Sequence, residues 1–133
     1  MLSFFQNLAN FLLPFLLGSL IFFAAIVAPN TFKTLEEQNA RKFIRSIFPK
    51  LYLWGGIISF LIFLCLLSFN NFFAFLMFIV FFGFVYSRQF LMKLINKAAD
   101  KKNNDKNFKR LHTFSVVIFV SQLLIMLILF ILL

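Results

Sequence analysis

The sequence is poor in the side chains that most catalytic and metal sites use. It contains one cysteine, one histidine and four acidic residues among 133 positions. A lone cysteine excludes a disulfide within the chain, and no His or Cys spacing matches a zinc site. The chain also lacks a glycine-rich phosphate loop and a nucleophile paired with a base. We therefore expect no enzymatic activity, no resident metal and no cofactor.

Charge is missing from most of the chain as well. All 13 basic and all four acidic side chains fall into two segments, residues 33–50 and 88–110. Outside these segments the chain is rich in phenylalanine, and 62% of all residues are hydrophobic, which is typical of an integral membrane protein. Because the net charge of +9 flanks membrane segments, we attribute it to topology and lipid headgroups and expect no binding to nucleic acid.

Four apolar runs are long enough to cross a bilayer, whose hydrocarbon core of about 30 Å needs about 20 helical residues. These runs are residues 4–28, 50–69, 71–92 and 111–133, and we expect helices at about 4–28, 50–69, 71–92 and 108–133. The second and third are separated only by the polar sequence SFNN, which predicts a tight helical hairpin. We therefore expect an all-α fold, an integral membrane four-helix bundle that forms a single domain over residues 1–133.

The loops at 29–49 and 93–107 contain most of the charge and lie on the same side of the membrane, because two spans separate them. The first basic segment has five Lys and Arg residues and the second has eight, whereas the amino-terminal residues and the hairpin turn have none. Short loops rich in Lys and Arg stay in the cytoplasm. We therefore expect a multi-pass protein of the cell (inner) membrane with both basic loops cytoplasmic and both termini outside.

The first loop contains a helical pattern of its own. Five apolar residues recur at the spacing of one helical face, namely Ala40, Phe43, Ile44, Ile47 and Phe48. Arg41, Lys42 and Arg45 lie largely off this face, and Pro49 suits the first turn of a new helix. We expect a short basic amphipathic helix between the first two spans, with its three cations at anionic lipid headgroups. The alternative is a connector packed under the bundle.

Polar residues within the spans are few and uncharged at the middle of the membrane, which weighs against a small proton-coupled exporter. They form two stripes, one of Asn7, Asn10, Pro14, Gly18 and Ala25 and one of Tyr52, Gly55, Gly56 and Ser59. Small residues let helices approach closely, and Asn can hydrogen-bond across an interface. We interpret both stripes as helix packing, and a substrate path is the alternative.

His112 is the only histidine, at the basic end of the fourth span on a stripe with Phe108, Ser115 and Gln122. One interpretation is a structural hydrogen bond to a neighbouring helix or loop. The other is a metal or haem ligand or a proton relay. Because no second ligand is spaced to join it, the second interpretation needs another chain or another molecule.

The sequences APNTFKTL, IFPKLY and INKAADKKNNDKNFKRLHTFS together resemble the transmembrane protein 205-like family, also called domain of unknown function 4149. The resemblance implies four helices with short motifs at their cytoplasmic ends. It also implies a candidate functional cluster, to which we assign Pro29, Phe32, Phe48, Pro49, Asn96, Phe108, His112 and Ser115.

These observations predict an accessory or scaffold membrane protein whose basic cytoplasmic face docks a partner. The expected partners are membrane lipids, including anionic headgroups, and either a second copy of the chain or another membrane protein. The alternative function is a small dimeric transporter or a haem- or copper-handling membrane protein that uses His112.

Overall fold

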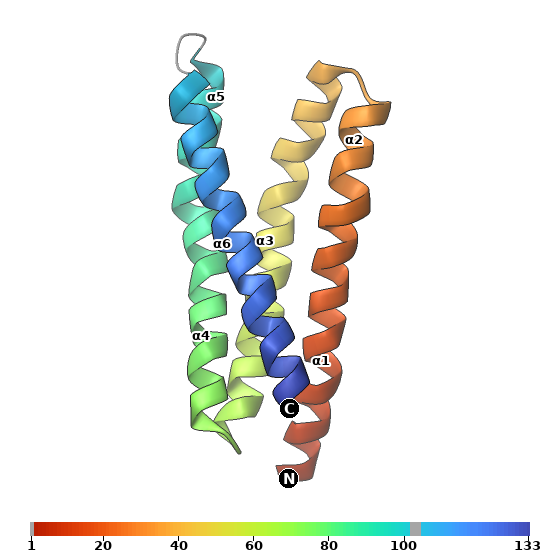
Figure 1. Cartoon of the computed structure of the whole chain (residues 1–133), viewed down its shortest axis with the longest axis vertical. Helices are drawn as coiled ribbons and strands as arrows, with labels where there is room; N and C mark the ends of the chain where they lie inside the picture. The colour runs from red at the N-terminus through yellow and green to blue at the C-terminus, as the bar shows by residue number, and fades with distance from the viewer. Residues whose placement is uncertain (1, 102–104) are drawn as a thin grey trace.

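A computed structural model describes residues 2–101 and 105–133, which form four helical columns (Figure 1). The first column consists of α1 (Leu2–Phe22), the π-helical turn η1 (Phe23–Val27) and α2 (Ala28–Thr34). The second is α3 (Glu37–Leu67). The third consists of α4 (Asn71–Tyr86), the π-helical turn η2 (Ser87–Leu91) and α5 (Met92–Asp100), and the fourth is α6 (Asp105–Leu132).

Each column is long and apolar enough to cross a membrane. The predicted all-α, membrane four-helix bundle is thus confirmed, and the chain is a multi-pass membrane protein. The predicted hairpin is also present: α3 ends at Leu67 and α4 begins at Asn71. The Asn70 side chain caps α4 by accepting a hydrogen bond from the Phe73 amide at 3.1 Å.

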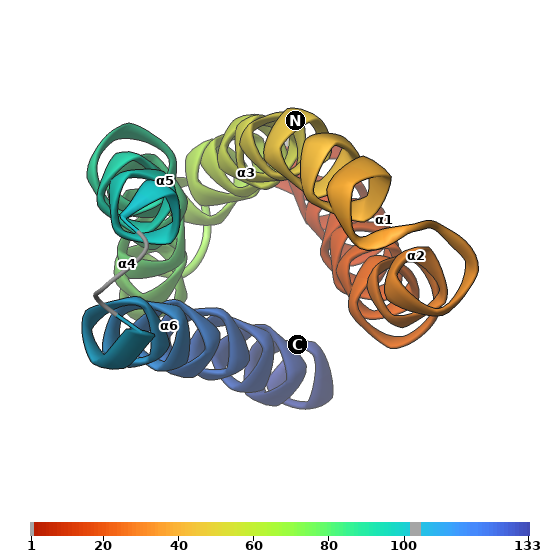
Figure 2. The ribbon, with the colours of Figure 1, turned by 90° about the horizontal axis from the view of Figure 1, so that it is seen from above.

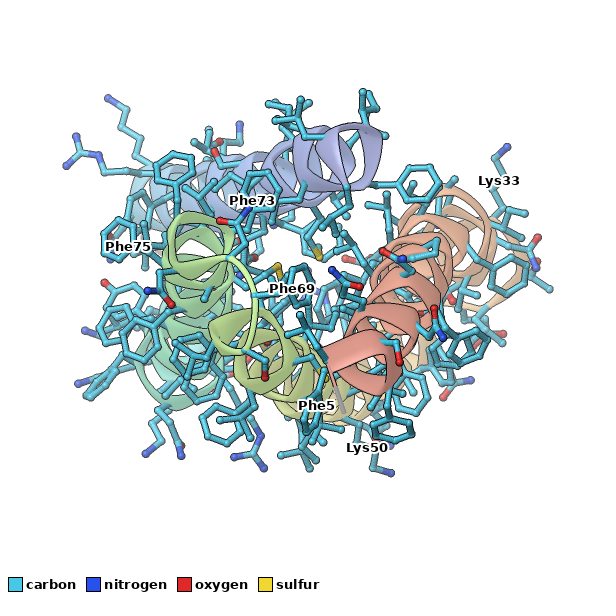
Figure 3. The ribbon with its side chains drawn as sticks, turned by 90° about the horizontal axis from the view of Figure 1, so that it is seen from below. Phe5, Lys33, Lys50, Phe69, Phe73 and Phe75 are labelled. Carbon is cyan, nitrogen blue, oxygen red and sulfur yellow. The ribbon has the colours of Figure 1, made fainter. Side chains whose placement is uncertain are left out.

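The two ends of the bundle differ in character (Figure 1). The hairpin end contains the turn between α3 and α4 and both chain termini. The basic end contains α2, the start of α3, α5 and the start of α6. Figure 3 views the bundle from the hairpin end, where Phe69 lies toward the middle of the bundle. Lys33 and Lys50, which belong to the far half of the first two columns, point outward from the bundle.

The amphipathic segment at 40–48 is not a separate element, which corrects the sequence prediction. It forms the first turns of α3, which runs through Pro49 without a break. A proline has no amide for the helical ladder and its ring crowds the carbonyl four residues earlier, so one intrahelical hydrogen bond is lost. Tertiary packing holds the helix together here, since Phe48 packs edge to face on Phe23 with ring centroids 5.3 Å apart.

The two segments predicted to be loops are also largely helical. Of loop 29–49, only Leu35 and Glu36 lie outside a helix. The helices therefore continue beyond the apolar runs that the sequence identified, into residues with polar and charged side chains. Of loop 93–107, residues 102–104 lie outside the described residues.

The core lies along the inner faces of the columns. It includes Leu13, Leu16 and Leu20 of α1, Ile62 and Leu66 of α3, Met77 and Val80 of α4, and Met126 and Leu129 of α6. The first three columns are neighbours in chain order, and α6 packs on both α4 and α1. Viewed from the basic end, the helices follow an open arc, and α6 leans toward α1 at its carboxyl end (Figure 2).

Candidate functional site

All eight residues of the candidate cluster lie in the helices of the basic half of the bundle (Figure 1). The structure separates them into smaller groups. Pro29 and Phe32 lie exposed on α2, and 60% of the Phe32 side chain is accessible. Phe48 and Pro49 lie half-buried on α3, Asn96 half-buried on α5, and Phe108, His112 and Ser115 on α6. A joint function of these groups stays a prediction.

Phe48 and Pro49 lie at the junction of three columns. Phe48 contacts Phe23 of η1 and also the Tyr52 ring, at a centroid distance of 5.8 Å. Tyr52 in turn lies 6.4 Å from the buried ring of Phe84 on α4. This aromatic chain connects the first, second and third columns at the depth where the apolar core gives way to the basic end.

Arg88 was missed by the sequence analysis, although it contacts one of the predicted residues. Its Nε donates a hydrogen bond to the Pro49 carbonyl at 3.2 Å, which links η2 to α3. A single Arg near the end of an apolar run resembles any other topology determinant in sequence. Only the packing of the third column on the second reveals that the guanidinium turns toward α3.

The two π-helical turns lie near the same end but have different origins. In η1, the Ala28 amide bonds to the Phe23 carbonyl, directly before Pro29. Proline has no amide and its ring crowds the carbonyl four residues earlier, so the wider turn relieves that crowding. In η2, the Met92 amide bonds to the Ser87 carbonyl, and no proline lies in or next to the turn. The local sequence therefore explains η1 but not η2.

His112 lies exposed on α6 and stacks on Phe108, with ring centroids 6.0 Å apart and planes 11° apart. The Ser115 hydroxyl donates to the His112 main-chain carbonyl at 2.7 Å. In the described part of the chain the imidazole forms no hydrogen bond to a neighbouring helix, and the structural hydrogen bond stays a prediction. A bond to residues 102–104 would lie outside this part.

Metal-ligating side chains are scattered in the described part of the chain. No three His, Cys, Asp or Glu residues there are close enough together to hold a metal ion. Cys65 is buried in α3, far along the sequence from His112. A haem or copper role of His112 therefore stays a prediction that requires a ligand from outside this chain.

The three cations assigned to headgroups are exposed near the start of α3. Arg41 pairs with Glu37 one turn earlier, at 2.9 Å. Arg45 pairs with Asp100 at the end of α5, at 2.6 Å, and so joins the two basic segments. Sequence spacing could indicate the first pair but not the second, because Asp100 is 55 positions away.

The two small-residue stripes have different outcomes. On α3 the packing interpretation is confirmed: Gly55 and Ser59 are buried, and a Cβ added at Gly55 would lie 2.7 Å from the Phe84 ring. On α1 it is wrong for Gly18, which has no neighbouring atom within 4 Å of an added Cβ. Asn10 instead lines a hollow of about 220 Å³ between α1 and the end of α6, together with Pro14 and Phe130.

Comparison with known proteins gives one match. The family model described as a domain of unknown function, DUF4149, matches residues 11–104. The chain belongs to this family. The matched region covers the second and third columns and the first column from residue 11 onward in this DUF4149 protein, including Pro29, Phe32, Phe48, Pro49 and Asn96.

The match ends before α6. The motif around Phe108, His112 and Ser115 is therefore supported by the sequence resemblance alone. No curated protein and no solved structure matches the chain.

Proposed function

We propose that this DUF4149 protein is an accessory membrane protein, without enzymatic activity, whose basic end faces the cytoplasm. There it binds anionic lipid headgroups and docks another membrane protein or a second copy of itself. The observation that supports this most is the helical extension of the basic end beyond the membrane, with the exposed cations of α3 on it.

Helix length supports the extension. The α3 helix has 31 residues, which at 1.5 Å per residue gives about 46 Å, whereas the hydrocarbon core is about 30 Å thick. If Leu67 marks one boundary of the core, the other lies about 20 residues earlier, near Ile47. Arg45 and Lys42 then fall about 3 to 8 Å beyond the hydrocarbon, which is the headgroup layer.

The carboxylate pairs do not abolish headgroup binding. In the Arg45–Asp100 pair, 39% of the Arg45 side chain and 65% of the Asp100 side chain remain exposed. Exposed ion pairs of this kind are weak, so a phosphate at the membrane surface competes with the carboxylate. Cytoplasmic leaflets carry negative surface potential, which favours this orientation of the basic end.

The orientation is tested with single cysteines in a Cys65→Ala background. Gln38→Cys places a thiol at the basic end and Ser68→Cys places one at the hairpin end, both at exposed positions. In intact cells, a membrane-impermeant maleimide should label Ser68→Cys only, and permeabilised cells should label both. Labelling of Gln38→Cys in intact cells would reverse the orientation and overturn the cytoplasmic role.

The headgroup role is tested on the full chain with Arg41, Lys42 and Arg45 all changed to Gln. In nanodiscs, the wild type should unfold at a higher temperature in phosphatidylglycerol than in phosphatidylcholine, and the variant should lose most of this difference. The loss follows from about 1 kcal/mol per cation near an anionic surface. Gln38, Asn39 and Ser46, all changed to Ala, form the matched control, because these neighbours are exposed and uncharged. An unchanged difference in the triple-Gln variant rejects the role.

A further inference from the structure

An apolar groove of about 300 Å³ lies between α3 and the third column. Leu53, Ile57 and Phe60 line it from α3, and Phe81 and Val85 line it from α4. Several of these side chains are exposed on the outer surface of the bundle, including Ile57 at 54%. Since the lining belongs to two membrane-spanning columns, the groove opens toward lipid and not toward water.

One end of the groove is polar. Arg88 and Gln89 of η2 complete its lining there. Counting about 20 residues from Asn71, the hydrocarbon boundary falls near Leu91, so Arg88 lies about 4 to 5 Å inside it. A cation inside the hydrocarbon is costly and calls for an anionic partner or a route to the headgroup layer.

The described residues supply only part of the hydrogen-bond acceptors that the Arg88 guanidinium can use. Its Nε donates to the Pro49 carbonyl, and among the described residues no carboxylate forms an ion pair with it. A guanidinium has five N–H donors in a planar fork that fits a phosphate. The bond from Nε fixes the position of the fork at the mouth of the groove.

The π-helical turn η2 is a second, independent feature of this place. The turn contains Arg88 and Gln89, and no proline accounts for it. Turns of this type are rare within helices and are frequent at functional sites. The wider turn contains both Arg88 and Gln89, the two residues of the third column that give the groove its polar end.

The dimensions fit one lipid from one leaflet. From Phe81 to Arg88 the third column rises by about 10 Å, which is less than the thickness of one leaflet, about 15 Å. An acyl chain can therefore lie along the groove while the phosphate remains at the level of the headgroups. A protein helix has a diameter of about 10 Å and is too wide for this volume.

We propose that this groove is a binding site for a single anionic phospholipid, with one acyl chain against Ile57 and Phe60 and the phosphate on Arg88. This proposal rests on the proposed function, in which the basic end binds anionic lipid headgroups. It deepens that function by naming one defined lipid site in place of a general surface. Arg88 supplies the charge, Gln89 lies beside it, and the aromatic rings of both helices form the walls.

Native mass spectrometry of the detergent-purified, delipidated full chain tests this proposal. Phosphatidylglycerol should bind at one lipid per chain with an affinity about fivefold above phosphatidylcholine, which corresponds to about 1 kcal/mol for one cation beside a lipid of net negative charge. Phosphatidylcholine has the same phosphate, but its choline cation cancels the net charge. Arg88→Gln should remove this preference, and Ile57→Trp should fill the groove and weaken both lipids.

Matched controls separate the site from general effects. Lys93→Gln removes a charge at the same end but outside the groove, and Ile79→Trp adds the same ring to the exposed face of α4 that does not line the groove. Both should bind phosphatidylglycerol as the wild type does. Helical circular dichroism and a monodisperse elution profile establish that each variant is folded, and Arg88→Lys should retain part of the preference.

Three outcomes would overturn the proposal. They are an unchanged preference in Arg88→Gln, equal losses in Ile79→Trp and Ile57→Trp, and a dimer in which Ile57→Trp disrupts the contact between chains. Competition by glycerol phosphate without acyl chains, as strong as by the lipid, would also contradict a lipid site. The proposed function has a separate test, the unfolding temperature of the triple-Gln variant in the two lipids. If one of the outcomes above is found and that variant still loses the difference between the lipids, the groove proposal is wrong and the proposed function stands.

Discussion

Two glycines make room for side chains of neighbouring helices. Gly55 of α3 makes room for the Phe84 ring, and Gly83 of α4 makes room for the Gln122 amide. A Cβ at Gly55 would lie 2.7 Å from the Phe84 ring, and a Cβ at Gly83 would lie 2.6 Å from the Gln122 amide nitrogen. That amide donates to the Val80 carbonyl at 2.8 Å and so joins α6 to α4 within the apolar core. Close approach of the backbones at these two places depends on the missing methyl groups.

Replacing each of three glycines by alanine should therefore change the stability of the protein by a different amount. Gly55→Ala should cost about 1 to 3 kcal/mol, because the added Cβ would overlap the fully buried Phe84 ring and force it to shift. Gly83→Ala should cost less, about 0.6 kcal/mol, since the flexible Gln122 end can move at the expense of one interhelical hydrogen bond. Gly18→Ala should stabilise by about 0.5 to 1 kcal/mol, because its Cβ meets open space in a helix.

Reversible unfolding in mixed micelles, followed by circular dichroism, measures these differences in unfolding free energy. Combining Gly55→Ala with Phe84→Leu should restore part of the loss, because the smaller side chain vacates the contested volume. If Gly55→Ala is as well tolerated as Gly18→Ala, the close packing of α3 on α4 described here is incorrect.

At the scale of elements, three prolines lie in helices with two different consequences. Pro14 lies within α1, Pro29 follows a π-helical turn, and Pro49 lies within α3. Membrane helices tolerate such breaks because neighbouring helices supply packing and partners for the freed backbone groups. Around Pro49 these are the Phe23 ring against Phe48 and the Arg88 guanidinium on the Pro49 carbonyl.

Pro49→Ala is expected to stabilise the protein by about 1 to 3 kcal/mol. The change restores an amide donor for the Arg45 carbonyl inside a helix that is already continuous. The same unfolding measurement in micelles checks this, with Pro14→Ala as the comparison, because Pro14 is also a half-buried proline within a continuous helix. A loss of stability in Pro49→Ala would mean that the proline geometry itself positions Phe48 and the Pro49 carbonyl.

At the scale of the whole molecule, the basic end is held together differently from the hairpin end. A short turn with a side-chain cap connects α3 and α4 at the hairpin end. At the basic end, the ion pair between Arg45 and Asp100 connects the start of α3 with the end of α5. A capped hairpin is insensitive to salt, whereas an exposed ion pair is screened.

A double-mutant cycle of Arg45→Gln and Asp100→Asn should give a coupling free energy below about 1 kcal/mol at low salt. The value should fall further at 1 M salt, where the Debye length is about 3 Å. The same cycle on Arg41 and Glu37, a pair within one helix, gives the control for a local contact. A coupling that persists at high salt would show that the two segments are held by more than this exposed pair.

The bundle was predictable from the sequence because the length of each apolar run and the position of the charges can be read from the sequence without knowing how the helices pack. Runs of about 20 apolar residues must cross the membrane as helices, since backbone groups in hydrocarbon have no other partners. The hairpin at Ser68 to Asn70 followed in the same way. The prediction failed at Pro49, where local preference disfavoured a continuous helix but packing on Phe23 outweighed it.

The candidate site was less predictable, because side chains far apart in sequence make it. Phe48 and Pro49 were named from a short motif, but their contacts with Phe23 and Arg88 depend on three columns being packed side by side. For His112, on a stripe with Gln122, the interpretation was a structural hydrogen bond to a neighbouring helix or loop, which stays a prediction. Gln122 is buried, but His112, nearly three turns earlier on α6, is exposed.

The sequence by itself determined that this protein is a membrane protein with four spans, that α3 and α4 form a hairpin, and that the charges lie at one end. These properties depend on the transfer of side chains and backbone between water and hydrocarbon, which is set by composition over about 20 residues. Only the tertiary structure decided that 40–48 belongs to α3, that Gly55 accommodates Phe84, and that Arg88 ends an apolar groove. Those features depend on which helix faces lie against one another, and local sequence does not fix that choice.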